Sequence, residues 1–341
     1  MTTHKGARLR HVRIVAAVDK FRGSATAAEV AAAIGHACWE RGHDCVEVPV
    51  ADGGEGLLDA LGGANRSSKI TGPLRTPVVA PWRLSKGTAV IEMALASGLD
   101  LVGGADANDP MEATTAGTGE LIDQAVTLGA KRIIVGLGGS ATSDGGLGAY
   151  QALGSPHRLA GVEVIVACDV TTRFTDAARV FGPQKGATPA QVEMLTRRLE
   201  QLVDRYRDEL GIDIADLEGG GAAGGLAGGL AALGARLVGG FDLVADELDL
   251  IDVIDGADLV ITGEGHLDAQ SFRGKVVGGV AQLAAEHGVD IAAIVGIADD
   301  DVTDRINYRS LVEMFGNDRS WNEPLWCIEK AAIDLLSAYE K

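Results

Sequence analysis

Glycine is concentrated where apolar runs of the sequence end, and this pattern constrains the fold more than any other feature. The chain has 341 residues, of which 47 are glycines. Four strand-like apolar runs end in an acid, in three cases within a glycine-rich turn: Val18-Asp19, Val50-Ala51-Asp52, Ala167-Cys168-Asp169 and Thr262-Gly263-Glu264. Ligands bind beyond the carboxyl ends of parallel strands, so these acids mark a candidate site. Each acid taken alone is also an ordinary turn former.

The order of the expected elements predicts parallel sheets. A strand over 12–18 is followed by a capping box at Thr26 and Glu29, a helix that stops at Gly42, and a strand over 45–50. Strand, helix and strand in this order predict a right-handed βαβ unit. Further strands are expected over 88–93, 131–137, 162–168, 257–262 and 289–295, and further helices over 118–128, 276–286 and 331–339.

The middle of the chain is less regular. Residues 71–81 are rich in turn formers and could mark a crossing between domains. Thr188-Pro189-Ala190-Gln191 predicts the start of a long amphipathic helix that ends at Gly211. Stretch 219–234 consists mainly of Gly, Ala and Leu. We favour a tightly packed loop and helix there over a ligand-facing glycine loop.

Charge and composition exclude several classes of partner. Lys plus Arg total 30 and Asp plus Glu total 48, which gives a net charge of −18. A chain this acidic repels nucleic-acid backbones and anionic lipid, and aromatic residues make up only 4%. The four cysteines form no CxxC pair, and the sequence has neither a secretory signal nor a run long enough to cross a bilayer. We therefore expect a cytoplasmic protein with small-molecule ligands, no nucleic acid and no membrane.

Two glycine-rich segments could hold charged ligands. Asp52-Gly53-Gly54-Glu55-Gly56 sets two carboxylates among glycines and could hold Mg²⁺ or a sugar-like hydroxyl. A tight turn with Glu55 in the first turn of a helix explains it equally well. Segment 136–146 follows a strand and carries hydroxyl side chains among glycines, which suits phosphate. It matches neither GxGxxG nor GxxxxGK[ST], so a P-loop fold is disfavoured while phosphate binding is not.

Charged residues gather in two further turns. Lys185 lies in a Gly-Pro turn and could neutralise phosphate oxygens, although a lone loop lysine is more often solvated. Mixed charges at high density suit phosphoryl transfer, which depends on positioning and neutralisation. A surface loop with exchangeable ion pairs is the plainer explanation. Residues 263–275 hold such a group, namely Glu264, His266, Asp268, Arg273 and Lys275.

Taken together, these motifs resemble the type-I glycerate kinase family. The matching stretches appear in family order over nearly the whole chain, at 19–24, 51–56, 92–99, 117–121, 138–146, 167–170, 180–187, 221–226, 258–265 and 273–275. The resemblance implies an α/β fold with a Rossmann-like parallel-sheet domain built from both chain ends, 11–70 and 250–341. A second α/β domain, 71–249, would be inserted between them, with the active site in the cleft. The implied reaction is ATP-dependent phosphorylation of D-glycerate to 2-phosphoglycerate with Mg²⁺.

The resemblance and the side-chain chemistry together suggest roles. Asp19 or Asp52 would orient or deprotonate the hydroxyl, and Arg22 and Lys275 would pair with the carboxylate or the phosphates. Mg²⁺ would be held by Asp169 or Glu264. Substrate contacts are expected from Lys20, Ser24, Glu55 and Arg273, and phosphate contacts from Gly138, Gly139, Ser140, Thr142 and Lys185.

The chain departs from the family pattern beside the expected site. Arg22 stands where Lys is usual, His266 where Arg is usual, and Thr172-Arg173 where Asn-Pro is usual. The loops after Gly154 and Asp169 are also shorter. These departures keep a second hypothesis open, a catalytically impaired relative that binds a ligand or regulates. A nicotinamide-dependent enzyme is disfavoured because segment 19–24 has one glycine where three are needed. A monomer or homodimer is expected.

Overall fold

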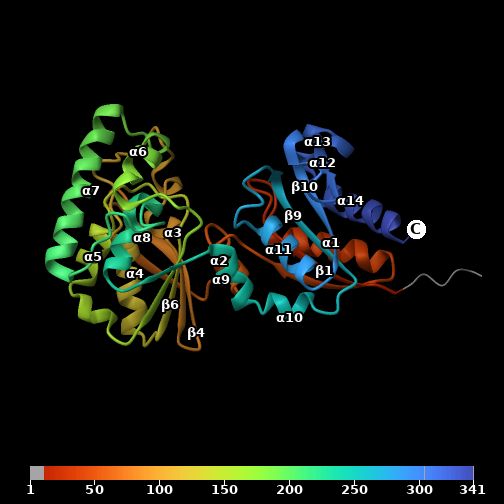
Figure 1. The fold of residues 1–341 in the computed structure, drawn as a ribbon, viewed down its shortest axis with the longest axis horizontal. Helices are drawn as coiled ribbons and strands as arrows, with labels where there is room; N and C mark the ends of the chain where they lie inside the picture. The colour runs from red at the N-terminus through yellow and green to blue at the C-terminus, as the bar shows by residue number, and fades with distance from the viewer. Residues whose placement is uncertain (1–10, 303, 341) are drawn as a thin grey trace, which may run out of the picture. The chain divides into compact units, whose positions relative to one another are not determined.

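The structure is a computed structural model that describes residues 11–302 and 304–340. The chain divides into two compact units, one of residues 52–243 and one of the residues up to 51 together with those from 244 onward. Figure 1 shows the red start of the described chain and its blue end in the same unit. Residues 52–70, which the sequence grouped with the chain ends, belong to the middle unit. The reason is that β3 (Arg66–Thr71) pairs with β4 (Pro77–Ser85).

The unit built from both chain ends holds a wholly parallel sheet. The strand order is β11-β10-β9-β1-β2. The chain therefore adds β2 on one side of β1 and all later strands on the other, so the strand order reverses between β1 and β9. Such a reversal is where open α/β sheets bind ligands. The strands are β1 (Arg13–Val18), β2 (Asp44–Pro49), β9 (Leu259–Leu267), β10 (Asp290–Ala298) and β11 (Tyr308–Ser310).

Helices cover both faces of this sheet. α1 (Ala27–Glu40) and α14 (Pro324–Tyr339) pack on one face in a single apolar core, and α11 (Val276–Glu286) packs on the other. α1 starts as expected, because Thr26 and Glu29 form both hydrogen bonds of a capping box. The remaining helices of the unit are α10 (Leu250–Ile254), α12 (Leu311–Phe315) and α13 (Asn317–Asn322).

Strand β9 is longer than the sequence indicates, and this corrects one expectation. The acidic turn expected after Thr262 is instead strand, and β9 pairs with β10 as far as Leu267. Glycines permit this close pairing: a Cβ on Gly263 would overlap the carbonyl oxygen of Ile294. Glu264 therefore projects from a strand interior.

The middle unit holds a mixed sheet in the order β3-β4-β5-β6-β7-β8. Its first two pairings are antiparallel and the other three are parallel. The stretch expected as turns over 71–81 is partly strand, since Pro77 and Pro81 both lie in β4. The remaining strands are β5 (Thr88–Glu92), β6 (Arg132–Gly136), β7 (Glu163–Ala167) and β8 (Arg236–Val238). The carboxyl ends of β5 to β8 thus meet along one edge.

Two helical layers cover this second sheet. α4 (Ala116–Thr127), α5 (Leu147–Leu153) and α8 (Ala222–Ala232) share one apolar core with the strands. The long α7 (Pro189–Leu210) packs with α6 (Ala177–Phe181) in a second core (Figure 1). As expected, α7 begins with a capping box at Thr188 and ends at Gly211 in the left-handed conformation.

The glycine-alanine stretch is tightly packed, as the sequence favoured. A Cβ on Gly228 would overlap the ring of Phe174, and one on Gly229 would lie 2.5 Å from the carbonyl oxygen of Gly145. Only glycine permits this approach of α8 to the loop that holds Gly145.

Short helical segments complete the described chain. These are α2 (Leu57–Ala60), α3 (Ala94–Ser97), α9 (Gly240–Glu247) and the 3₁₀ turns η1 (Asp100–Val102), η2 (Pro156–Leu159), η3 (Phe174–Asp176), η4 (Pro183–Lys185) and η5 (Asp300–Val302). Among the residues described, no helix combines the length and apolar character that a membrane span requires.

Candidate functional site

Two carboxylates converge where the strand order of the parallel sheet reverses. Asp19 directly follows β1, and Glu264 lies on the neighbouring β9. The backbone N–H of Asp19 donates to the carbonyl oxygen of Gly263 at 2.9 Å, which fixes the two segments together. Both residues are only 9% exposed. The sheet topology therefore gathers two acids that are 245 positions apart in the sequence.

The surroundings of Glu264 raise the pKa of its carboxyl group. Burial is the main cause, the nearby carboxylates of Asp19 and Asp268 act in the same direction, and the resulting pKa is about 7. A hydrogen bond from Ser271 and the charge of Lys275 act in the opposite direction. Within the described part of the chain, the buried Oε1 of Glu264 has no hydrogen-bond partner.

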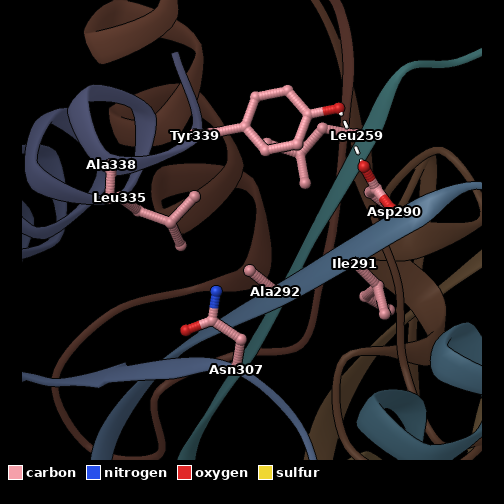
Figure 2. Close-up of a pocket in the computed structure, with 8 residues that line it drawn as sticks. All are labelled: Leu259, Asp290, Ile291, Ala292, Asn307, Leu335, Ala338 and Tyr339. Carbon is pink, nitrogen blue, oxygen red and sulfur yellow. Dashed lines mark hydrogen bonds between the residues drawn. The ribbon is translucent and has the colours of Figure 1, made fainter. Parts of the chain in front are cut away.

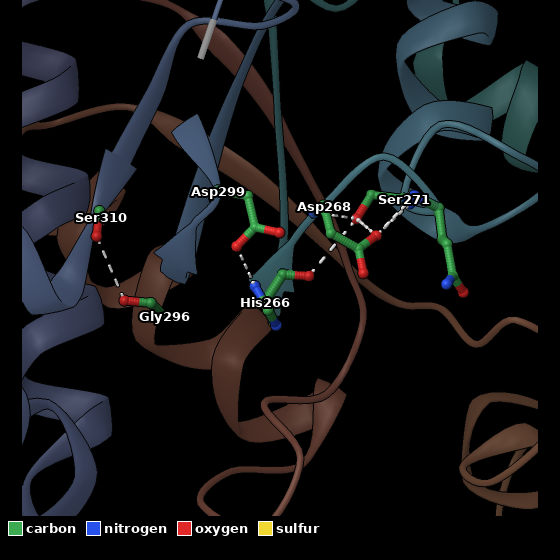
Figure 3. Close-up of polar contacts among 7 residues, drawn as sticks. His266, Asp268, Ser271, Gly296, Asp299 and Ser310 are labelled. Carbon is green, nitrogen blue, oxygen red and sulfur yellow. Dashed lines mark hydrogen bonds and ion pairs between the residues drawn. The ribbon is translucent and has the colours of Figure 1, made fainter. Parts of the chain in front are cut away.

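This acidic group fits a divalent cation. Mg²⁺ prefers carboxylate oxygens, and a bound cation would relieve both the crowding of like charges and the unsatisfied oxygen of Glu264. Asp268 is already engaged, because its Oδ1 accepts hydrogen bonds from the backbone N–H groups of Gln270 and Ser271 at 2.7 and 3.0 Å (Figure 3). Glu264, whose buried Oε1 has no hydrogen-bond partner among the described residues, is therefore the better candidate for a metal ligand.

A tight turn after β1 carries the expected cationic residue. Phe21 and Ala25 exchange backbone hydrogen bonds at 2.8 and 2.9 Å, which leaves Arg22 exposed at the tip. Gly23 in this turn has φ of +80°, and the indole of Trp321 packs against it. Trp321 is 63% exposed and was missed by the sequence reasoning, because nothing in the sequence links α13 to this turn.

Two other expected substrate residues in this turn make local contacts. The ammonium of Lys20 lies 3.6 Å from Oδ1 of Asp19. The Ser24 hydroxyl donates to the carbonyl oxygen of Phe21 at 3.2 Å. The Lys20 side chain thus lies beside the Asp19 carboxylate, and the Ser24 side chain is held within the turn.

The segment that follows Glu264 holds a histidine–aspartate contact and the start of a helix. The ring Nε2 of His266 lies 2.8 Å from Oδ1 of Asp299, and both side chains are exposed (Figure 3). Lys275 is the N-cap residue of α11, and its charge reaches Glu264. Arg273 is exposed, so of the two expected cations Lys275 is the one coupled to the acidic group.

In the middle unit, the loop 52–56 is anchored over the carboxyl ends of the parallel strands. Gly53 has φ of +87°, and a Cβ there would lie 2.5 Å from Cα of Gly240. The carboxylate of Glu92, at the end of β5, accepts from the backbone N–H groups of Gly56 and Leu58 at 3.1 and 2.7 Å. Glu92 therefore holds this loop in place, a role that the sequence reasoning did not foresee.

The two expected acids of the loop differ in their surroundings. Oδ1 of Asp52 accepts from the backbone N–H of Gly54 at 3.3 Å, and Glu55 is exposed to solvent. Asp169, at the end of β7, is also exposed, and its Oδ1 accepts from the backbone N–H of Gly240 at 2.6 Å. The described contact of Asp169 thus fixes the turn after β8, and this makes it a weaker candidate for metal binding than Glu264.

The glycine-serine loop, residues 136–146, lies beside loop 52–56. A Cβ on Gly138 would stand 3.3 Å from Cα of Gly54, so the two loops touch through glycines. Gly139 is exposed, whereas Ser140 and Thr142 are buried. Exposed backbone at glycine next to buried hydroxyls is a surface that phosphate oxygens can approach closely.

A buried acid shapes the end of this loop. Asp144 accepts from the backbone N–H and hydroxyl of Thr115 at 2.8 and 2.9 Å, and from the N–H groups of Gly146 and Gly148 at 3.2 and 3.1 Å. Burial raises the pKa of Asp144, and these hydrogen bonds oppose the shift. Asp144 thus fixes the backbone conformation at the end of the loop.

Lys185 is buried rather than solvated. Its side chain is 3% exposed, and its ammonium donates to Oγ of Ser140 at 2.7 Å and to the carbonyl oxygen of Thr142 at 2.6 Å. These two hydrogen bonds therefore tie the turn that holds Lys185 to the glycine-serine loop.

Each unit gathers its own share of the expected residues. The unit of the chain ends brings together Asp19, Lys20, Arg22, Ser24, Glu264 and Lys275, with Arg273 exposed nearby in sequence. The middle unit brings together Asp52, Glu55, Gly138, Gly139, Ser140, Thr142, Lys185 and Asp169. The expectation that both groups share a cleft stays a prediction.

A pocket elsewhere in the unit of the chain ends is unrelated to these residues. It lies at the start of β9 and β10 beside α14 (Figure 2). Glu264 lies further along β9, in the interior of the strand. Within it the Tyr339 hydroxyl donates to Oδ2 of Asp290 at 3.1 Å. None of the expected site residues lines it.

Comparisons with known proteins agree with one another. The family model described as the glycerate kinase family matches residues 14–157 and 155–340. Glycerate 2-kinase of Escherichia coli strain K12 is 42% identical, with 85% of this chain and 87% of that protein covered. Glycerate kinase of Bacillus subtilis strain 168 is 41% identical, covering 84% and 85%. A crystal structure from Salmonella typhimurium LT2, described as glycerate kinase 2, superposes with a TM-score of 0.84 at 36% identity, covering 96% of this chain and 98% of that one.

Proposed function

Since this chain belongs to the glycerate kinase family, we propose that it transfers the γ-phosphoryl group of ATP to a hydroxyl of D-glycerate. The product is 2-phosphoglycerate, and the protein acts in the cytoplasm as a monomer or homodimer. Several relatives carry the name glycerate kinase, and the alternative of an impaired ligand-binding relative has no support among them.

The reaction brings glycerate and ATP together, so the site residues gathered by each unit would act on the same two substrates. The hydroxyl oxygen of glycerate attacks the γ-phosphorus, the bond from that phosphorus to the bridging oxygen breaks, and ADP leaves. The hydroxyl proton passes to a carboxylate, for which Asp19 is the first candidate and Asp52 the second. Arg22 and Lys275 pair with the glycerate carboxylate or the transferred phosphoryl group.

ATP phosphates would lie on the glycine-serine loop. Backbone N–H groups at Gly138 and Gly139 can approach phosphate oxygens without a side chain between them. Bound Mg²⁺ supplies charge neutralisation at the phosphates. Glu264 would hold it, with Asp169 as the alternative in the middle unit.

One observation carries this proposal beyond family membership. The reversal of strand order between β1 and β9 gathers Asp19, Glu264 and Lys275, which are the acid and cation types that phosphoryl transfer uses. A sheet that merely formed a core would not need three charged groups at this point.

Steady-state kinetics of the purified protein test the proposal. ADP release is followed with D-glycerate, ATP and Mg²⁺, and each component is omitted in turn. Enolase, which dehydrates 2-phosphoglycerate, is then added to identify the product. We expect ADP release that requires both glycerate and the metal, followed by phosphoenolpyruvate. Binding of ATP and glycerate without ADP release would overturn the assignment.

A further inference from the structure

Lys185 is placed to shape the loop rather than to touch a ligand. Its ammonium lies 2.7 Å from the Ser140 hydroxyl oxygen and 2.6 Å from the Thr142 carbonyl oxygen, and the side chain is 3% exposed. Burial lowers the pKa of Lys185 to about 7, while the Asp144 carboxylate opposes the shift. A lysine reaching toward ATP phosphates would instead lie in contact with solvent.

The backbone around Lys185 is tied to the same loop by a second residue. Nδ2 of Asn108 donates to the carbonyl oxygen of Lys185 at 2.9 Å and to that of Ala141 at 3.0 Å. One amide group thus joins the lysine turn to the residue between Ser140 and Thr142.

A close backbone contact also holds the turn that contains Lys185. Gly186 has φ of +90°, and a Cβ there would overlap the carbonyl oxygen of Ala105. Segments around 105–108, 140–142 and 185–186 are therefore packed into one assembly with little freedom to move separately.

We propose that Lys185 and Asn108 are positioning residues that hold the glycine-serine loop in the shape that receives the phosphates of ATP. This inference rests on the proposed kinase function and deepens it. It also reassigns Lys185, which the sequence suggested as a phosphate contact, to a bracing role.

Preorganisation of the loop lowers the entropy cost of binding a ligand. A glycine-rich loop loses much backbone entropy when it takes a single shape around a ligand. If buried hydrogen bonds already fix the backbone from Ser140 to Thr142, this entropy is lost when the chain folds and not when the ligand binds. Loss of the brace should therefore weaken ATP binding more than glycerate binding.

Three variants test the bracing role. Lys185→Met keeps the length and apolar stem but removes the donor, and Asn108→Ala removes the second brace without changing any charge. Lys131→Met changes an exposed lysine of the same unit and serves as the matched control. Circular dichroism and thermal unfolding establish which variants fold. The Asn108 variant still decides the question if Lys185→Met does not fold.

The expected result separates the two substrates. We expect Lys185→Met to raise KM for ATP about 10-fold and Asn108→Ala about 3-fold, with KM for glycerate changed less than about 2-fold. The double variant should raise KM for ATP by less than the product of the single effects, because both residues hold one loop. The control should match the wild-type chain.

Other outcomes overturn the inference. If Asn108→Ala leaves KM for ATP unchanged while Lys185→Met raises it, Lys185 acts on phosphate directly. If neither variant changes KM for ATP, or if KM for glycerate rises equally, the loop is not positioned by these residues. Should the wild-type chain release no ADP, the proposed function fails separately, and calorimetric ATP affinities of the same variants decide the bracing role.

Discussion

The backbone N–H of Asp19 donates to the carbonyl oxygen of Gly263 at 2.9 Å, joining the end of β1 to the middle of β9. These two strands are neighbours although the chain forms six other strands of the second sheet between them. The bond places the Asp19 carboxylate beside Glu264 at the reversal of strand order.

Replacing Asp19 should impair chemistry more than binding. Asp19→Asn keeps the size of the side chain but removes the base, so we expect kcat to fall by about 10²- to 10⁴-fold. KM for ATP should change by less than about 3-fold. Steady-state kinetics measure both values, and Asp318→Asn on exposed α13 is the control. An unchanged kcat would transfer the role to Asp52.

Gly53 should tolerate no side chain. In Gly53→Ala, Cβ would lie 2.5 Å from Cα of Gly240 and 2.8 Å from Cβ of Ala167, in addition to the strain of φ at +87°. We expect the free energy of unfolding of the chain to fall by about 3 kcal/mol or more. Gly63→Ala has similar strain at φ of +72° but nothing within 4 Å, so it should cost about 1 kcal/mol. Urea denaturation compares the two, and equal losses would contradict the contact with Gly240.

Removing the Asp144 carboxylate should destabilise the middle unit. Asp144→Ala leaves donors of Thr115, Gly146 and Gly148 without their acceptor in a buried place. We expect a loss of about 3 kcal/mol, because unsatisfied buried donors cost about 1–3 kcal/mol each and water can reach some of them. Asp216→Ala, which breaks only an exposed ion pair with Arg173, should change stability by less than about 0.5 kcal/mol. Similar losses in both variants would show that Asp144 is not a structural acceptor.

Local signals in the sequence were sufficient for much of the fold. The capping boxes at Thr26 and Thr188 form as expected, because the side chain and the backbone groups that it caps lie within one turn. The parallel sheet of the chain ends follows from apolar runs alternating with helices. In each case the information lies within a few residues.

Features that depend on distant partners could not be predicted. β9 continues past Gly263 because β10 lies against it. β4 accepts Pro77 and Pro81 because β3 pairs with that stretch on one side, while β5 pairs only with residues 83–85. The burial of Lys185 likewise depends on Ser140 and Thr142, which precede it by more than 40 residues. Propensity and spacing carry no record of such pairings.

Trp321 should affect the use of glycerate through the turn that it packs against. Trp321→Ala removes the indole from Gly23, next to Arg22, and we expect KM for glycerate to rise about 3- to 10-fold while KM for ATP stays nearly constant. Trp39→Ala is the matched control, since Trp39 is 73% exposed in the same unit. Equal effects of the two variants on kinetics would remove Trp321 from the site.

The stability of the chain should carry a pH dependence that comes from Lys185. Its pKa is about 7 in the folded chain and 10.5 ordinarily, so between these values the unfolded chain binds more protons. The contribution of this residue to the free energy of unfolding therefore rises with pH from about 7 toward 10.5, by up to about 1.4 kcal/mol per pH unit. Below pH 7 both states are protonated and the contribution is flat. Urea denaturation of the wild-type chain and Lys185→Met across this range should show a difference that changes with pH, whereas Lys131→Met should run parallel to the wild type. A constant difference between wild type and Lys185→Met would mean that Lys185 keeps its ordinary pKa and that its burial is incomplete in solution.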